Sequence, residues 1–229
     1  MINDRRDSLW GRRKGKPLSA RRVHLMETRF TELALDLTNP APSDLASLFP
    51  ATVSSVRLEI GFGGGEHMIY DALAGPEVGY IGVEPFLNGM AKAVTAIAEE
   101  EVANIRLFGG DAVVLLDWLP AASIERVDLL YPDPWPKKRH RKRRFVSSAN
   151  LDRIARVLIP GGLFRVATDI AAYADWTLLQ LAGRPDFAWT AERSDDWLLP
   201  FPGWNSTRYE AKAVAAGRRS TYLAHQRVG

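Results

Sequence analysis

Short apolar runs rich in β-branched and aromatic residues alternate with helical stretches from about residue 50 onward, and this pattern constrains the fold most strongly. Such alternation favours an α/β fold, in which a parallel sheet carries crossover helices on both faces. Five strands are expected, at residues 56–60, 79–83, 105–108, 127–131 and 163–167. Helices are expected at residues 65–74, 86–101, 112–118, 145–158 and 171–182. Two later strand-like runs, 187–192 and 219–227, are expected to form an antiparallel hairpin at the sheet edge.

The length and composition exclude several classes of protein. With 229 residues, 46% of them hydrophobic, the chain can bury one large core. It has no cysteine, which excludes disulfides and thiolate metal sites, and its four histidines are far apart, so no metal is expected. No apolar segment resembles a signal peptide or is long enough to cross a bilayer. We therefore expect a cytoplasmic protein without membrane contact, either a monomer or a homodimer.

The net charge of +3 is distributed unevenly. Residues 1–22 carry +6 and residues 137–144 (KKRHRKRR) carry +7, which leaves −10 on the other 199 residues. An acidic body with two concentrated basic segments indicates a polyanionic partner that is held in one place. We expect residues 1–22 to form a flexible basic arm and residues 23–229 to form a single domain. Taken alone, the arm is equally consistent with a solvated tail or a localisation signal.

A glycine-rich turn follows the first expected strand. That strand ends in Glu59, and residues 61–65 (GFGGG) come directly before a helical stretch. A turn of this kind lets a ligand approach the bare backbone and directs helix N–H groups toward it. The dinucleotide-binding pattern would need glycine where the chain has Glu66, so NAD is disfavoured. By itself the turn is also consistent with a tight structural loop.

Acidic residues end the next two strands of the pattern. Glu84 lies 23 residues after Gly61, where an acid in this architecture can bind both ribose hydroxyls, and Asp111 follows the third strand. The carboxyl ends of neighbouring parallel strands form one ligand crevice. For Asp111 alone, a helix N-cap is an alternative role.

The segment after the fourth strand is the most specific in the chain. Residues 131–140 read YPDPWPKKRH, and four more basic residues follow at 141–144. Together with residues 59–63 (EIGFG), 167–169 (ATD) and 207–210 (TRYE), this segment resembles the tRNA (guanine-N7)-methyltransferase family over about residues 50–229. The resemblance implies a Rossmann-like seven-stranded methyltransferase sheet with an antiparallel last strand, S-adenosyl-L-methionine as cofactor, and tRNA as partner. It also implies the usual target of the family, the variable-loop guanosine at position 46 of tRNA.

The resemblance further implies roles for individual residues. The cofactor would be bound by the glycine turn and the carboxylates at the strand ends: Glu59, Gly61, Gly63, Glu84, Asp111 and Asp133. The substrate site would consist of Lys137, Asp169, Thr207, Arg208, Tyr209 and Glu210. The RNA contacts would come from Arg139, His140, Arg141, Lys142, Arg143 and Arg144.

Asp133 is the expected catalytic residue. Guanine N7 has an available lone pair, so its methylation requires positioning and electrostatics and no strong general base. Asp133 lies between Pro132 and Pro134, where it could bind the amino-acid end of the cofactor or stabilise the purine cation; a merely rigid loop is the alternative. Trp135 is a candidate to stack on the target base or, equally, to pack in the core.

A carboxylate is expected to recognise guanine, because it can accept hydrogen bonds from both N1–H and the 2-amino group. Asp169 and Glu210 are the two candidates; for Glu210, a surface ion pair with Arg208 or Lys212 is the alternative. Two other functions stay open on the sequence. The chain could methylate another RNA or a small molecule, or it could bind RNA without catalysis.

Overall fold

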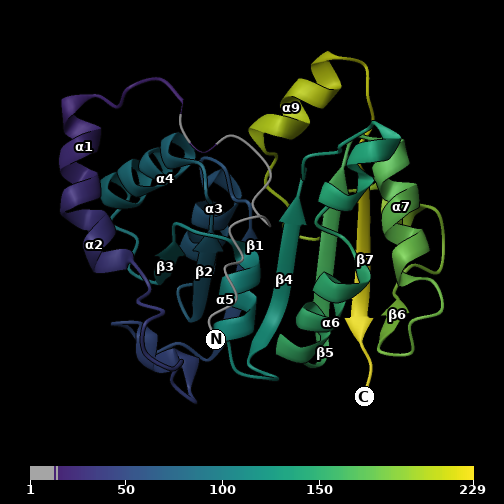
Figure 1. Cartoon of the computed structure of the whole chain (residues 1–229), viewed down its shortest axis with the longest axis horizontal. Coiled ribbons are helices and arrows are strands. Elements are labelled where there is room, and N and C mark those ends of the chain that lie inside the picture. The colour runs from purple at the N-terminus through teal and green to yellow at the C-terminus, as the bar shows by residue number, and fades with distance from the viewer. Residues whose placement is uncertain (1–12, 14) are drawn as a thin grey trace.

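The computed structural model describes residue 13 and residues 15–229, and these form one seven-stranded sheet with helices on both faces (Figure 1). The strand order is β3-β2-β1-β4-β5-β7-β6. The strands are β1 Ser55–Ile60, β2 Val78–Val83, β3 Ile105–Phe108, β4 Ile124–Leu130, β5 Leu158–Thr168, β6 Phe187–Trp189 and β7 Thr221–Arg227. Strands β1 to β5 are parallel, and β7 runs antiparallel to both β5 and β6. The predicted α/β fold and its terminal antiparallel hairpin are confirmed.

The crossover helices agree with the sequence pattern to within a few residues. They are α3 Glu66–Ala74, α4 Leu87–Glu99, α5 Ala112–Trp118, α6 Ser148–Val157 and α7 Ala171–Leu181. Several other helices were not expected: α1 Ala20–Glu27, α2 Arg29–Leu33, η1 Leu45–Leu48, η2 Lys138–Arg143, α8 Asp195–Leu198 and α9 Arg208–Ala215. Most of these are short, and α1 and η2 bury no residue, so no apolar stripe marks them in the sequence.

Side chains on the two faces of the sheet belong to two separate apolar clusters, because successive residues of a strand point to opposite faces. On one face, Leu58 of β1 and Val127 of β4 pack with residues of α5, α6 and α7. On the other face, Tyr80 of β2 and Leu107 of β3 pack with α3 and α4. The sheet therefore has a three-layer architecture that fixes the carboxyl ends of its strands.

The described part of the basic N-terminal segment lies against the start of α4. Leu87 N donates a hydrogen bond to Arg13 O at 3.0 Å, and Gly15 N donates to Asn88 Oδ1 at 2.6 Å. Asn88 Nδ2 in turn donates to Lys16 O at 2.7 Å. The expected boundary after residue 22 falls inside α1, while residues 1–12 and 14 of the expected arm lie outside the described residues.

The topology creates a crevice at one edge of the sheet. The strand order reverses at β1, whose neighbours β2 and β4 lead away in opposite directions. In open α/β sheets, ligands bind outside the carboxyl ends of the strands at such a reversal. Helix α9 lies beyond the carboxyl end of β4 and closes one side of this region (Figure 1). Among the described helices, none is both long and apolar enough to span a bilayer.

Candidate functional site

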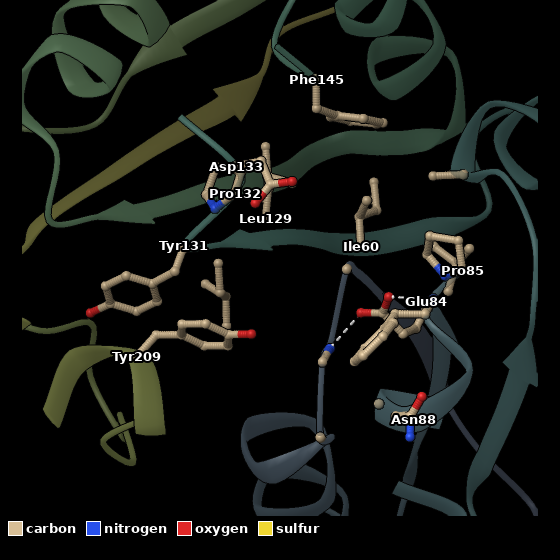
Figure 2. A pocket seen from close by; sticks show the side chains of 18 of the residues that line it. Ile60, Glu84, Pro85, Asn88, Leu129, Tyr131, Pro132, Asp133, Phe145 and Tyr209 are labelled. Carbon is tan, nitrogen blue, oxygen red and sulfur yellow. Dashed lines mark hydrogen bonds between the residues drawn. The ribbon is translucent and has the colours of Figure 1, made fainter. Parts of the chain in front are cut away.

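A pocket of about 610 Å³ lies at this reversal of strand order (Figure 2). Its walls come from the carboxyl ends of β1, β2 and β4, from the loop after β3, and from the starts of α4 and α9. The predicted site residues that line it are Gly61, Gly63, Glu84, Asp111, Asp133, Arg143, Arg208 and Tyr209. Residues far apart in the sequence are thus brought together where the crevice was expected.

The glycine turn after β1 forms the floor of the pocket. Gly63 has a φ of 59°, in the left-handed region that a side chain rarely adopts. Helix α4 packs closely on the same turn: a Cβ added at Gly89 would lie 2.5 Å from Gly63 O. Because both positions are bare backbone, a ligand can lie directly on the turn while α4 supports it from the other side.

Glu84 holds the glycine turn in place. Its Oε2 accepts a hydrogen bond from Gly63 N at 2.8 Å, and its Oε1 accepts one from Phe86 N at 2.8 Å (Figure 2). Burial raises the pKa of the Glu84 carboxyl, and these two hydrogen bonds oppose that shift. The residue therefore orders the loop as well as lining the pocket.

Asp111 combines two roles that the sequence left as alternatives. It lines the pocket, and its Oδ1 accepts a hydrogen bond from Val113 N at 2.9 Å as the N-cap of α5. The capping bond fixes the carboxylate at the crevice.

Asp133 lies across the pocket from Glu84 (Figure 2). Partial burial raises the pKa of the Asp133 carboxyl above its ordinary value. The loop that carries it is tightly bent, since Tyr131 has a φ of 50° and Trp135 a φ of 39°. Strained backbone of this kind persists only where its surroundings hold it, and it is often found at functional sites.

Arg144 holds this loop, and its position corrects the expectation of an RNA contact. The side chain is buried, its Nε donates a hydrogen bond to Pro134 O at 2.9 Å, and its Nη1 donates to Ala172 O at 3.3 Å. The guanidinium also lies over the rings of Tyr173 and Trp176. A buried cation satisfied by these groups cannot reach a phosphate, so Arg144 is structural.

The rest of the basic run is at the surface beside the pocket. Arg139, Arg141 and Lys142 belong to η2 and are exposed, and Lys137, just before it, is exposed as well. Arg143 turns inward, lines the pocket, and places its guanidinium 4.9 Å from the centre of the Trp135 ring.

The ring of Trp135 also packs edge-on against His140, with ring centroids 5.8 Å apart. Trp135 is not among the residues that line the pocket. Its contacts are therefore those of a packed side chain that supports η2.

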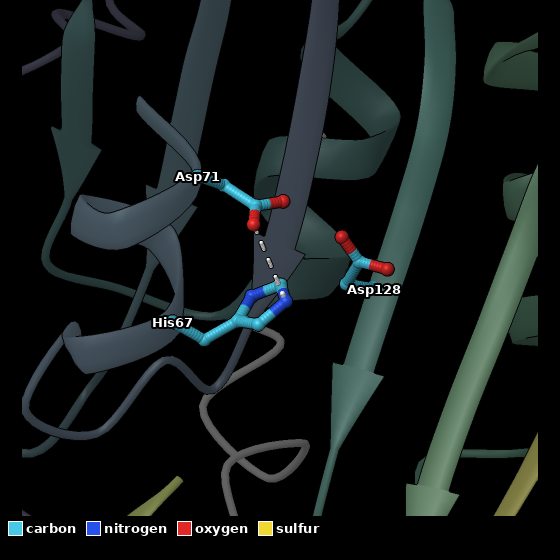
Figure 3. Close-up of side chains that lie close together, drawn as sticks. All are labelled: His67, Asp71 and Asp128. Atoms are coloured by element: carbon cyan, nitrogen blue, oxygen red, sulfur yellow. Dashed lines mark ion pairs between the residues drawn. The ribbon is translucent and has the colours of Figure 1, made fainter. Parts of the chain in front are cut away.

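Glu59 does not line the pocket. Its carboxylate is buried on the face of β1 toward α3, where Oε2 is 2.8 Å from His67 Nδ1. It belongs to a buried cluster of three carboxylates, two guanidiniums and one imidazole: Glu59, Asp71, Asp128, Arg126, Arg165 and His67. Figure 3 shows the imidazole of His67 with the carboxylates of Asp71 and Asp128 beside it.

The charges in this cluster balance when His67 is protonated. Asp128 accepts from Arg126 at 2.7 Å and from Arg165 at 2.6 Å, and Arg126 is also paired with Asp71. The pKa of Asp128 is lowered: its burial is outweighed by these guanidiniums. Burial opposes protonation of His67, but the surrounding carboxylates dominate and raise its pKa. His67, Asp71 and Asp128 are close enough together to share a metal ion. In this cluster, however, Arg126 and Arg165 supply the positive charge that faces the carboxylates.

The expected substrate residues have different surroundings. Thr207 is the N-cap of α9, its hydroxyl accepting from Glu210 N at 3.1 Å. Glu210 accepts from Trp204 Nε1 at 2.8 Å with one oxygen and from the Tyr222 hydroxyl with the other. Asp169 forms an ion pair with Arg218 at 2.7 Å. Both proposed guanine-recognising carboxylates therefore already have partners within the protein, whereas Arg208 and Tyr209 face the pocket.

Charged side chains of both signs line the pocket. Its carboxylates are those of Glu84, Asp111 and Asp133. Cationic side chains also line it, and two of them, Arg143 and Arg208, come from η2 and α9. This arrangement suits a ligand with a positively charged centre and a polyanion that approaches along the rim. Tyr131 also lines the pocket and was not among the expected site residues, although its position directly after β4 was a usable signal.

Comparisons with known proteins agree with this architecture. Residues 54–223 match the family model Methyltransf_4, described as "Putative methyltransferase". A curated tRNA (guanine-N(7)-)-methyltransferase of Rhizobium meliloti (strain 1021) is 58% identical over 221 residues, which are 96% of this chain and 95% of the relative. A protein of the same name from Agrobacterium fabrum (strain C58 / ATCC 33970) is 54% identical over 217 residues, covering 95% and 94%.

Solved structures resemble the chain in fold. The 16S rRNA methyltransferase KamB superposes with a TM-score of 0.54 at 18% identity, covering 84% of this chain and 96% of its own. TrmN from Thermus thermophilus superposes with a TM-score of 0.53 at 18% identity, covering 87% of this chain and 52% of its own. At this identity, the likeness concerns the fold of the sheet and its helices.

Proposed function

The chain belongs to the tRNA (guanine-N7)-methyltransferase family, and on that premise we propose that it transfers a methyl group from S-adenosyl-L-methionine to N7 of a guanine in tRNA. The observation that carries the proposal is the combination of a pocket at the switch point, lined by a glycine turn and three carboxylates, with a basic segment beside it. Relatives that bear this activity in their names match the chain over nearly its whole length.

The residues of the pocket fit the cofactor. A bare glycine turn suits close approach of a ligand, Glu84 and Asp111 suit hydroxyl and amine donors, and three carboxylates favour a sulfonium cation. When bound, S-adenosyl-L-methionine supplies an activated methyl group. Glu59 supports the glycine turn indirectly. Its carboxylate contacts the imidazole of His67, the second residue of α3, and α3 starts directly after the turn. We therefore assign direct contact to Gly61, Gly63, Glu84, Asp111 and Asp133.

The protein contributes position and charge to the reaction. Attack by N7 requires no proton removal, so a base is unnecessary at this site. Asp133 is held on a strained loop by Arg144. Its carboxylate would stabilise the positive charge that passes from the cofactor to the purine. Prior alignment of the two reactants supplies the rest of the acceleration.

The partner and the target base are part of the same proposal. Arg139, His140, Arg141, Lys142 and Arg143 would contact RNA phosphates near the pocket, and Lys137 would belong to the substrate site. The target would be the variable-loop guanosine of tRNA, the enzyme would work in the cytoplasm as a monomer or homodimer, and no metal would take part. The basic residues before α1 would add positive charge to a single catalytic domain.

The test is methylation of bulk tRNA. The full chain is incubated with methyl-labelled S-adenosyl-L-methionine and tRNA, and the digested nucleosides are separated. Label in 7-methylguanosine is expected. Label in another nucleoside would indicate a different RNA methyltransferase, and tRNA binding without label would indicate a non-catalytic RNA-binding protein. A tRNA whose variable-loop guanosine is replaced by adenosine should accept no label.

A further inference from the structure

Two tyrosines from different elements face each other at one wall of the pocket. Tyr131 directly follows β4, and Tyr209 is the second residue of α9. Their ring centroids are 6.3 Å apart and their planes are inclined by 18° (Figure 2). Both residues line the pocket, next to Asp133.

The two rings are oriented as an aromatic slot for a planar base requires, because their planes are inclined by only 18°. Carbon atoms in contact lie about 3.5 Å apart, so a base held between two rings needs about 7 Å between their planes. The ring centroids of Tyr131 and Tyr209 are 6.3 Å apart, so the gap has to widen to admit a purine. The slot therefore requires that one of the two rings can move.

Tyr131 is the fixed wall. Its backbone N donates to Ala167 O at 2.7 Å, and its hydroxyl is 2.9 Å from Ser220 Oγ. The ring packs against the cluster that contains Tyr222, whose hydroxyl donates to Glu210. These contacts from β5, β7 and α9 hold the ring in a single orientation.

Tyr209 is the adjustable wall. The residue is 42% exposed, and the contacts of its ring are with the long side chains of Arg208 and Lys212. Across the pocket floor, a Cβ added at Gly63 would lie 3.5 Å from the Tyr209 ring, so the glycine leaves room beside it. The Tyr209 ring can therefore move away from Tyr131 when a base enters.

The chemistry of the product favours aromatic walls. Methylation at N7 leaves a positive charge on the purine, and the face of an aromatic ring attracts a cation. Burial raises the pKa of Tyr131 to about 12, so its hydroxyl stays neutral at physiological pH. A neutral electron-rich face against the purine would stabilise the developing charge without competing for the methyl group.

We propose that Tyr131 and Tyr209 form the two walls of a slot that holds the target guanine by stacking, beside Asp133. This assignment rests on the proposed function and names the part of the site that takes the base. It also replaces Trp135 as the stacking residue, because the Trp135 ring packs against His140 and Arg143 outside the pocket.

The test compares leucine and phenylalanine variants at both positions. Tyr131→Leu and Tyr209→Leu remove the aromatic face, whereas Tyr131→Phe and Tyr209→Phe keep it and lose only the hydroxyl. Leucine should lower kcat/KM on tRNA by about tenfold or more, and phenylalanine by about twofold or less. The affinity for S-adenosyl-L-methionine should stay unchanged in all four. Tyr70→Leu, at a similarly exposed tyrosine of α3, is the matched control and should behave as wild type.

A second readout follows stacking itself. A single-stranded RNA with one emissive guanosine analogue is titrated with each variant, and its emission should be quenched by wild type and by the phenylalanine variants but not by the leucine variants. The slot would be refuted if both leucine variants methylated tRNA at the wild-type rate. It would also be refuted if the phenylalanine and leucine variants lost kcat/KM equally. If the wild-type chain formed no 7-methylguanosine, the proposed function would fail, while the emission titration would still decide whether the slot stacks a base.

Discussion

Arg144 is bound to the loop of Asp133 through Pro134: the guanidinium Nε donates a hydrogen bond to the Pro134 carbonyl oxygen at 2.9 Å. The last arginine of the basic run therefore helps to fix where a pocket carboxylate lies. Arg141 and Lys142 of the same run are exposed, and the difference arises because Arg144 packs between the loop and α7.

Arg144→Gln should destabilise the protein and slow methyl transfer. Loss of a buried charged donor leaves two carbonyl oxygens without their partner, which costs about 2 kcal/mol of the free energy of unfolding. Urea unfolding measures the first effect and single-turnover methylation the second. The exposed neighbour Arg141→Gln is the control and should unfold as wild type. Equal stability of the two variants would contradict the structural role of Arg144.

Asp133→Asn should abolish methyl transfer while tRNA binding stays within a few-fold of wild type, because the change removes a pocket charge and leaves the basic surface intact. Burial raises the pKa of Asp133, so the carboxylate is lost as pH falls through that raised value. The kcat/KM of wild type should decline on the acid side accordingly. Asp175→Asn, on the exposed side of α7, should keep the wild-type profile. Normal turnover of Asp133→Asn would refute the assigned role.

Substitution of Arg139, Arg141 and Lys142 by glutamine should weaken tRNA binding and flatten its salt dependence. Each phosphate contact that is lost reduces the slope of log K against log salt by about one unit. Binding isotherms at several salt concentrations measure this slope. Arg153→Gln is the control, because Arg153 of α6 is paired with Asp117 of α5. Weaker tRNA binding with an unchanged salt slope would show that these residues of η2 have a structural role and do not contact RNA phosphates.

Stability should depend on pH through His67. The pKa of His67 is raised in the folded state, so protonated His67 stabilises the folded protein. This stabilisation is fully present below the pKa of the unfolded state and is lost as the pH rises through the pKa of the folded state. Each unit by which the pKa is raised corresponds to about 1.4 kcal/mol of the free energy of unfolding. Urea unfolding from pH 7 upward should show decreasing stability, a window that avoids His225, whose pKa burial lowers to about 4.

The variant His67→Gln leaves the carboxylates of the cluster with one positive charge fewer. It should be less stable than wild type at pH 7, and the difference should narrow as the pH rises. His24→Gln, at an exposed position of α1, should keep the wild-type dependence. A constant difference between His67→Gln and wild type over this range would show that His67 is neutral in the folded protein.

The sequence by itself determined the sheet and the position of the crevice. Apolar strand patterns, the glycine turn and acids at the strand ends are local signals, and parallel strands bring their carboxyl ends together whatever the details of packing. Glu84, Asp111 and Asp133 could be placed at one site for that reason. The terminal hairpin was likewise predictable, because its two strand-like runs follow the last crossover helix.

Only the tertiary structure decided which polar side chains face the pocket. Whether Glu59 points to a ligand or to His67 depends on the face of β1 that α3 covers, and a strand end does not reveal this. Whether Arg144 is solvated or buried depends on α7, which lies far along the chain. The pairing of Tyr131 with Tyr209 arises because α9 lies beyond the carboxyl end of β4, a long-range arrangement that no local pattern contains.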